Sequence, residues 1–270
     1  MIALLPIAVV LVACFLYFYL TRWRDQWLRS KPFPAAWLGI LTTGLPVYAS
    51  LSPEQQTRLR QLIQLFIARK RFYGCAGLAI TDEMRVTIAA EACLLLLNRG
   101  WSVYPKLTSV LVYPTAFRVE RDQHQSDGTV ASGEHHLLGE SWGNGRVILS
   151  WDDVENGVGD FSDGHNVVLH EFAHQLDAES GSTNGAPPLR RNSYKSWATV
   201  FSENFENLKD LSLHRHKTVM DEYGTTNPAE FFAVATETFF EKPHQLYKKR
   251  PDLYDELRLY YQLDPRNWQL

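Results

Sequence analysis

The chain has 270 residues, and 27 Lys and Arg stand against 30 Asp and Glu, which gives a net charge of −3. A hydrophobic fraction of 45% with 13% aromatic residues excludes a disordered chain, and three cysteines exclude a disulfide scaffold. Because a general nucleic-acid binder usually carries a basic excess, we expect no direct nucleic-acid partner.

The first 20 residues contain no charged side chain and are followed by a basic cluster that begins at Arg22. As a helix they would be about 30 Å long, the thickness of a bilayer core. With the positive-inside rule, this pattern predicts one transmembrane anchor at 1–21, a single-pass inner-membrane protein and a main domain in the cytoplasm. The segment 11–14 also resembles a lipoprotein cleavage box, so lipid attachment at Cys14 is the alternative.

Proline and glycine punctuate residues 22–50, which predicts a linker before one domain at 51–270. Ser52 followed by Pro53 is typical of a helix start, because Ser caps a helix and Pro suits its first position. A second, mostly buried helix is predicted over 81–97 from its run of apolar residues.

Strand patterns follow at 109–113 and 146–151, and the second comes after a Gly-Asn-Gly turn. From residue 163 onward the apolar spacing is helical, and four helices are predicted at about 165–178, 192–208, 227–241 and 251–262. Strands followed by helices predict an α+β domain with a small mixed sheet.

The stretch that carries chemistry is His170-Glu171-Phe-Ala-His174. Residues i and i+4 share one face of a helix, so both imidazoles can reach one cation. Glu171 points about 100° away, where its carboxylate can reach a metal-bound water instead of the metal. This H-E-x-x-H pattern predicts two zinc ligands and a general base on an active-site helix.

Apolar neighbours surround these polar groups, and burying them without a partner would be costly, which disfavours two ordinary core histidines. A third ligand leaves one position open for water. The metzincin spacing would need histidine at position 180, which is Ser180, so that class is excluded. Glu230 and Glu237, on one face of the helix predicted at 227–241, remain as candidates. For Glu237 the favoured alternative is a carboxylate that supports a ligand or stabilises the helix without binding the metal.

Four strings make a resemblance specific, namely HEFAHQLD, DEYGTTNPAEFFAVATETFF, SVLVYPTAF and GRVILSWDDV. They resemble the Mlc titration factor A family of zinc peptidases over about residues 50–265. Around the metal, that family is similar to the lethal-factor-type gluzincins. The resemblance implies a zincin-like metallopeptidase domain that hydrolyses peptide or protein substrates, as an aminopeptidase or an endopeptidase.

The resemblance also implies roles for individual residues. His170, His174 and Glu230 would bind one zinc ion per chain, and Glu171 would be the base. Tyr223, seven residues before Glu230, would be a catalytic tyrosine that donates to the oxyanion. A sugar-responsive transcriptional repressor is the implied partner, and a non-catalytic zinc protein that binds such a repressor is the alternative function.

Overall fold

The computed structural model describes residues 4–115 and 145–268, with side chains from residue 9 onward. In chain order the helices and 3₁₀ turns are α1 (Leu4–Ser30), α2 (Ala35–Gly44), η1 (Pro46–Ser50), α3 (Pro53–Arg69), α4 (Asp82–Leu94), α6 (Trp151–Gly159), α7 (Val167–Ala178), α8 (Tyr194–Leu213), η3 (Glu222–Thr225), α9 (Pro228–Glu241), α10 (Pro243–Lys249), α11 (Pro251–Tyr261) and η4 (Pro265–Asn267). The strands are β1 (Arg71–Gly74), β2 (Ser109–Tyr113) and β3 (Arg146–Ser150).

The three described strands form one sheet in the order β1-β2-β3, and both pairs are parallel. Ser109 of β2 lies opposite Arg71 of β1 and Arg146 of β3. Parallel neighbours need a crossover connection, and α4 provides it between β1 and β2. The predicted α+β class with a mixed sheet is therefore wrong: the fold is mixed α/β with a small parallel sheet.

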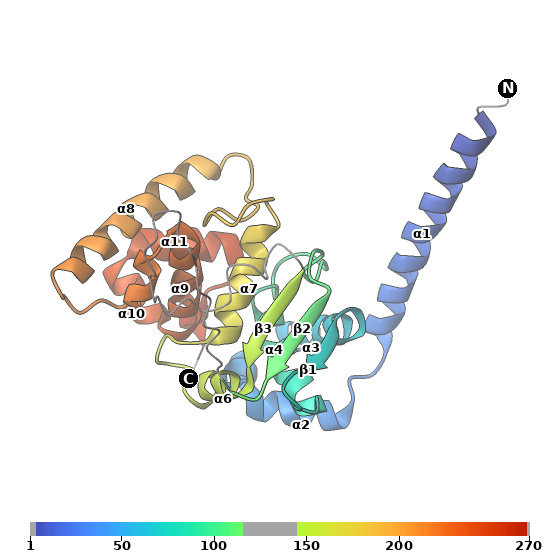
Figure 1. Ribbon diagram of the computed structural model, residues 1–270, viewed down its shortest axis with the longest axis horizontal. Coiled ribbons are helices and arrows are strands. Elements are labelled where there is room, and N and C mark those ends of the chain that lie inside the picture. Colours follow the sequence, from blue (N-terminus) through green and yellow to red (C-terminus); the bar gives the residue numbers. More distant parts are fainter. Residues whose placement is uncertain (1–3, 116–144, 269–270) are drawn as a thin grey trace, which may run out of the picture.

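Helix α1 runs without a break from the apolar leader into the basic residues after it, and it projects away from the other helices (Figure 1). In the part of the chain that the structure describes, no helix has the length and apolar character to cross a membrane. This finding overturns the predicted transmembrane helix at 1–21 and the inner-membrane localisation, and it leaves the membrane as a partner without support.

Residues 22–50 were expected to form a linker. In the structure this segment contains the end of α1, all of α2 and η1. Leu41, Leu45 and Val47 are fully buried in the core. The Asp25 carboxylate pairs with Arg69 of α3, so the end of α1 is attached to the domain.

Side-chain caps explain where the helices begin. Ser52 forms the predicted cap of α3 and exchanges hydrogen bonds with Gln55 in a capping box. Thr81 caps α4, Asn166 caps α7 and Asn227 caps α9, each by accepting backbone N–H groups of the first turn. The two helices that bear the candidate site residues thus start at asparagines.

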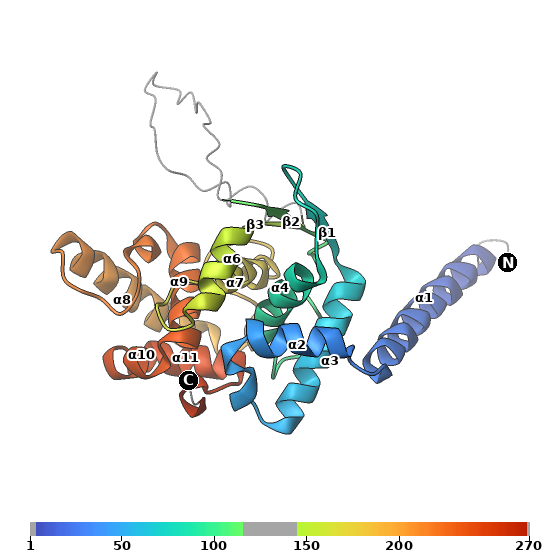
Figure 2. The ribbon, with the colours of Figure 1, turned by 90° about the horizontal axis from the view of Figure 1, so that it is seen from below.

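Helices α3 and α4 cover one face of the sheet, as the two ribbon views agree (Figures 1 and 2). Helix α7 lies between this part and the C-terminal helices α8 to α11. Its Phe172 packs against Phe66 of α3 and Tyr104, with ring centroids 5.6 and 4.8 Å away. On the other side, α7 packs against α9, whose Phe232 contacts Trp197 of α8. Helix α7 is therefore fixed from both directions.

Candidate metal centre

Helix α7 presents His170 and His174 on one face, one turn apart, and the rest of the helix holds them in place. Both residues are buried, with 8% and 0% of their surface exposed, and Glu171 between them is fully buried. The Asn166 side chain accepts the N–H of Leu169 at 2.9 Å and fixes the start of the helix. The predicted active-site helix is thus a well-capped, buried element.

Helix α9 places Glu230 in its first turn. Oδ1 of Asn227 accepts the backbone N–H groups of Ala229 and Glu230 at 2.9 and 3.1 Å. Pro228 occupies the first helical position, where a missing N–H costs nothing. Glu230 is buried, with 6% of its surface exposed, and its side chain points toward α7 rather than into solvent.

Three side-chain atoms from these two helices meet at one point. Oε2 of Glu230 lies 3.0 Å from Nε2 of His170 and 3.2 Å from Nε2 of His174. The two Nε2 atoms are 3.1 Å apart. The structure therefore brings Glu230, rather than Glu237, to both imidazole Nε2 atoms, and the ligand atoms of all three residues lie within 4.8 Å of one another.

The pKa values in this cluster are strongly shifted. Burial lowers the pKa of His174 to about 4. Burial also acts against protonation of His170, but the charge of Glu237 and hydrogen bonds with Glu230 and Glu237 raise its pKa well above the usual value. For Glu230, burial is outweighed by hydrogen bonds from the two histidines, which lower its pKa to about 2. The cluster therefore favours a positive charge between its nitrogens and the Glu230 carboxylate.

The chemistry of these atoms fits a metal ion. Two imidazole nitrogens and a carboxylate oxygen all carry lone pairs, and placing them about 3 Å apart is costly unless a cation or proton lies between them. The raised pKa of His170 indicates that a proton can meet this need. The same three atoms can hold a metal ion in place of that proton. The two imidazole nitrogens and the carboxylate oxygen are therefore suitable ligands for a metal ion.

Tyr223 lies beside this cluster. Its ring centroid is 6.0 Å from that of His170. Burial, with smaller contributions from the charges of Glu230 and Glu171, raises the pKa of the phenol to about 12. At neutral pH the side chain therefore keeps its proton and can donate a hydrogen bond.

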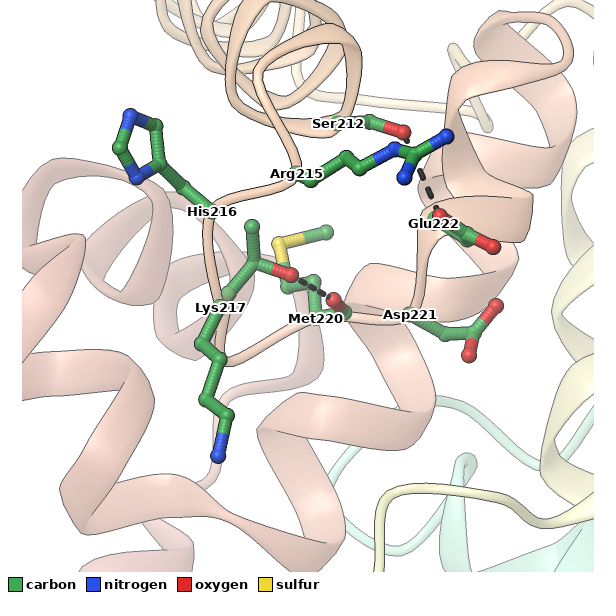
Figure 3. Close-up of a pocket in the computed structure, with 8 residues that line it drawn as sticks. Ser212, Arg215, His216, Lys217, Met220, Asp221 and Glu222 are labelled. Atoms are coloured by element: carbon green, nitrogen blue, oxygen red, sulfur yellow. Dashed lines mark hydrogen bonds between the residues drawn. The ribbon is translucent and has the colours of Figure 1, made fainter.

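A pocket of about 340 Å³ lies in the loop that leads into Tyr223, between the end of α8 and η3 (Figure 3). The Ser212 hydroxyl donates to Glu222 at 3.4 Å, and Thr218 donates to the carbonyl of Met220. Asp221 caps η3 by accepting the N–H of Tyr223 at 2.7 Å. These bonds shape the loop, and none of the three clustered residues lines the pocket.

Two further carboxylates act at the ends of α7. Oε1 of Glu237 lies 2.7 Å from Nδ1 of His170. Asp177, at the other end, accepts the N–H of Gly185 at 2.6 Å. Gly185 has a positive φ of 79°, and a Cβ there would lie 2.3 Å from the carbonyl oxygen of Pro228. Asp177 and Gly185 thus join the end of α7 to the start of α9.

Asn166, Glu91 and Glu241 were not expected from the sequence as parts of this surrounding network. Nδ2 of Asn166 donates to Oε1 of buried Glu91 at 3.3 Å, and Oε2 of Glu241 accepts the N–H of Gly164 at 2.9 Å. One signal was available: Glu230, Glu237 and Glu241 are spaced by seven and four residues, which places them on one helix face. Glu91 had no such signal, because it stands alone in an apolar run.

Comparisons with known proteins find relatives over most of the chain. The family described as glucose-regulated metallo-peptidase M90 matches residues 20–262. An uncharacterized protein of Synechocystis sp., slr2042, is 46% identical over 246 residues, which cover 90% of this chain and 89% of the relative. Mlc titration factor A of Yersinia pestis and of Yersinia pseudotuberculosis are each 32% identical over 245 residues, covering 88% of this chain and 89% of the relatives.

Proposed function

Because this chain belongs to the glucose-regulated metallopeptidase family M90, we propose that it is a zinc-dependent peptidase with one zinc ion per chain. One observation supports the proposal: the buried side chains of His170, His174 and Glu230, from two helices, place their ligand atoms close together. Two histidines and one glutamate form a ligand set of catalytic zinc sites, which leave a position open. A structural site normally closes with four protein ligands.

In the proposed mechanism His170, His174 and Glu230 would hold the metal ion, and a bound zinc ion would supply the Lewis-acid chemistry that polarises a peptide carbonyl. Glu171 takes a proton from the attacking water and delivers it to the leaving amine. The Tyr223 phenol, protonated at neutral pH, donates a hydrogen bond to the oxyanion of the tetrahedral intermediate. Burial of Glu171 keeps its proton transfers away from bulk water.

A second function is favoured by the relatives named Mlc titration factor A. We propose that this chain also binds a sugar-responsive transcriptional repressor, and that this binding does not need hydrolysis. If both functions coexist, Glu171→Gln removes hydrolysis and leaves repressor binding intact.

Metal analysis of the purified protein tests the first proposal. We expect about one zinc ion per chain, lost in His170→Ala and retained in Glu171→Gln, because only the histidine is a ligand. Chromogenic amino-acid anilides and short peptides, with and without chelator, then test hydrolysis and separate aminopeptidase from endopeptidase activity. Zinc-free wild type contradicts the zinc site, and zinc-loaded wild type without hydrolysis of any peptide favours the repressor-binding function.

A further inference from the structure

One carboxylate of α9 holds two different parts of α7 at once. Oε1 of Glu237 lies 2.7 Å from Nδ1 of His170, and Oε2 accepts the backbone N–H of Asn166 at 2.7 Å. Glu237 is buried, with 6% of its surface exposed, so water competes little for these bonds. Asn166 is the cap of α7. The orientation of one imidazole and the start of its helix therefore depend on the same side chain.

The direction of these bonds has a consequence for His170. A carboxylate only accepts hydrogen bonds, so Nδ1 must carry the proton that it shares with Glu237. Nε2, on the other side of the ring, faces Glu230 and His174 and can then offer a lone pair to a metal ion. We propose that Glu237 is a positioning residue that fixes His170 in the tautomer needed for metal binding and anchors the cap of α7. This inference rests on the proposed function.

A glutamine at position 237 cannot perform both tasks. It has one acceptor oxygen and one amide NH₂ group, whereas Asn166 and His170 both present donors. If the oxygen faces His170, the NH₂ group faces the N–H of Asn166 and the cap loses its anchor. If the oxygen faces Asn166, the NH₂ group faces Nδ1 of His170. The ring then carries its proton on Nε2, where the metal should bind.

Glu241 offers a matched control on the same helix, four residues further on. It is 3% exposed, and its Oε2 accepts one backbone N–H, from Gly164. Its Oε1 makes no hydrogen bond within the described residues. Burial raises the pKa of Glu241 to about 8, so at neutral pH it is mainly a neutral acid, which glutamine imitates. Glu241→Gln therefore changes a buried glutamate in the same way without creating a conflict between donors.

The test compares zinc affinity by competition with a chelating indicator. We expect Glu237→Gln to bind zinc about 10- to 100-fold more weakly than wild type, the range typical of outer-sphere partners of metal ligands. Glu241→Gln should bind zinc as wild type does. NMR of zinc-loaded protein with ¹⁵N-labelled histidine gives a readout that packing damage alone does not produce. We expect His170 of the wild type to carry its proton on Nδ1, and this signal to be lost in Glu237→Gln.

Glu237→Gln with wild-type affinity, or an equal loss in Glu241→Gln, overturns the inference. If Glu237→Gln does not fold, the NMR spectrum of the wild type decides, and a proton on Nε2 of His170 contradicts the inference. These failures leave the zinc site of the wild type in place. A wild type that binds no zinc overturns the proposed function instead, and the inference with it.

Discussion

Helices α4 and α9 each bury a glutamate in an otherwise apolar run, Glu91 and Glu230, and the two carboxyl groups behave in opposite ways. Glu91 is fully buried, and burial raises its pKa to about 8, because its hydrogen bond from Asn166 compensates only in part. Glu230 is almost as buried, but hydrogen bonds from two imidazoles outweigh burial and lower its pKa to about 2. Burial alone therefore does not decide the charge of a core carboxyl group; partners that can carry positive charge do.

The same contrast recurs within α9. Glu230 contacts both imidazoles, whereas Glu241 is three turns away, where it accepts a backbone N–H and lies near the Asn166 side chain. Burial raises the pKa of Glu241 to about 8, as for Glu91. Buried carboxyl groups on one helix face thus divide into a charged group at the candidate metal centre and a neutral group at its periphery.

The largest difference in zinc affinity is expected between two glutamine variants, Glu230→Gln at the candidate metal centre and Glu91→Gln at its periphery. Glu230→Gln removes the negative charge opposite the histidines, so zinc affinity should fall by more than the about 100-fold that marks the upper range for outer-sphere partners. Glu91→Gln replaces a neutral acid by a neutral amide and should leave zinc affinity unchanged. Zinc titration of both variants makes the measurement, and equal losses would show that burial rather than metal ligation explains both residues.

A smaller effect is expected at Tyr223. Tyr223→Phe keeps the ring beside His170 and removes only the hydroxyl donor, so kcat should fall about 10²- to 10³-fold, as for other oxyanion donors. Zinc content should stay at the wild-type level, in contrast to Glu230→Gln. Steady-state kinetics on an anilide or peptide substrate measures this, and an unchanged kcat excludes the phenol from the reaction.

The sequence predicted the parts of the site that depend on local spacing. The i, i+4 positions of His170 and His174 determine a shared helix face, and outside the site Ser52 marks the start of α3 through its own side chain. The choice between Glu230 and Glu237 stayed open from the residues alone, because both lie on the same face. Only the packing of α9 against α7 brings Glu230 to both Nε2 atoms.

Less of the fold could be predicted where pairing between distant residues decides the structure. β1 is a four-residue strand with mostly exposed side chains, so it has no apolar pattern, and it was not predicted. Without it, the crossover through α4 and the parallel order of the sheet could not be derived. The contact of Glu91 with Asn166 joins residues 75 positions apart. No spacing rule links such positions.

A third prediction concerns the pH dependence of stability. The pKa of Glu91 is raised from 4.5 to about 8 in the folded protein. The stability that the protonated form of Glu91 contributes is therefore fully present below about pH 4.5 and is lost as pH rises through 8. Over this range the free energy of unfolding falls with a slope approaching about 1.4 kcal/mol per pH unit. Glu91→Gln removes this slope, so the variant should gain stability relative to wild type between pH 5 and 8. Urea unfolding at several pH values measures the difference.

Glu241 has the same shift, but it is present in both proteins and cancels in the comparison of wild type with Glu91→Gln. Equal pH profiles of the two proteins would mean that Glu91 stays ionised in the core.

The smallest effects are expected at the caps of the two helices. Thr81→Ala removes one hydrogen bond to the first turn of α4, and Asn227→Ala removes two from the first turn of α9. Each should lower the free energy of unfolding by about 0.5–2 kcal/mol. Only Asn227→Ala should also weaken zinc binding, because one of its lost bonds fixes the backbone of Glu230. Chemical unfolding and zinc titration of both variants separate the two effects, and a loss of zinc affinity in Thr81→Ala would mean that general destabilisation, rather than the position of Glu230, limits metal binding.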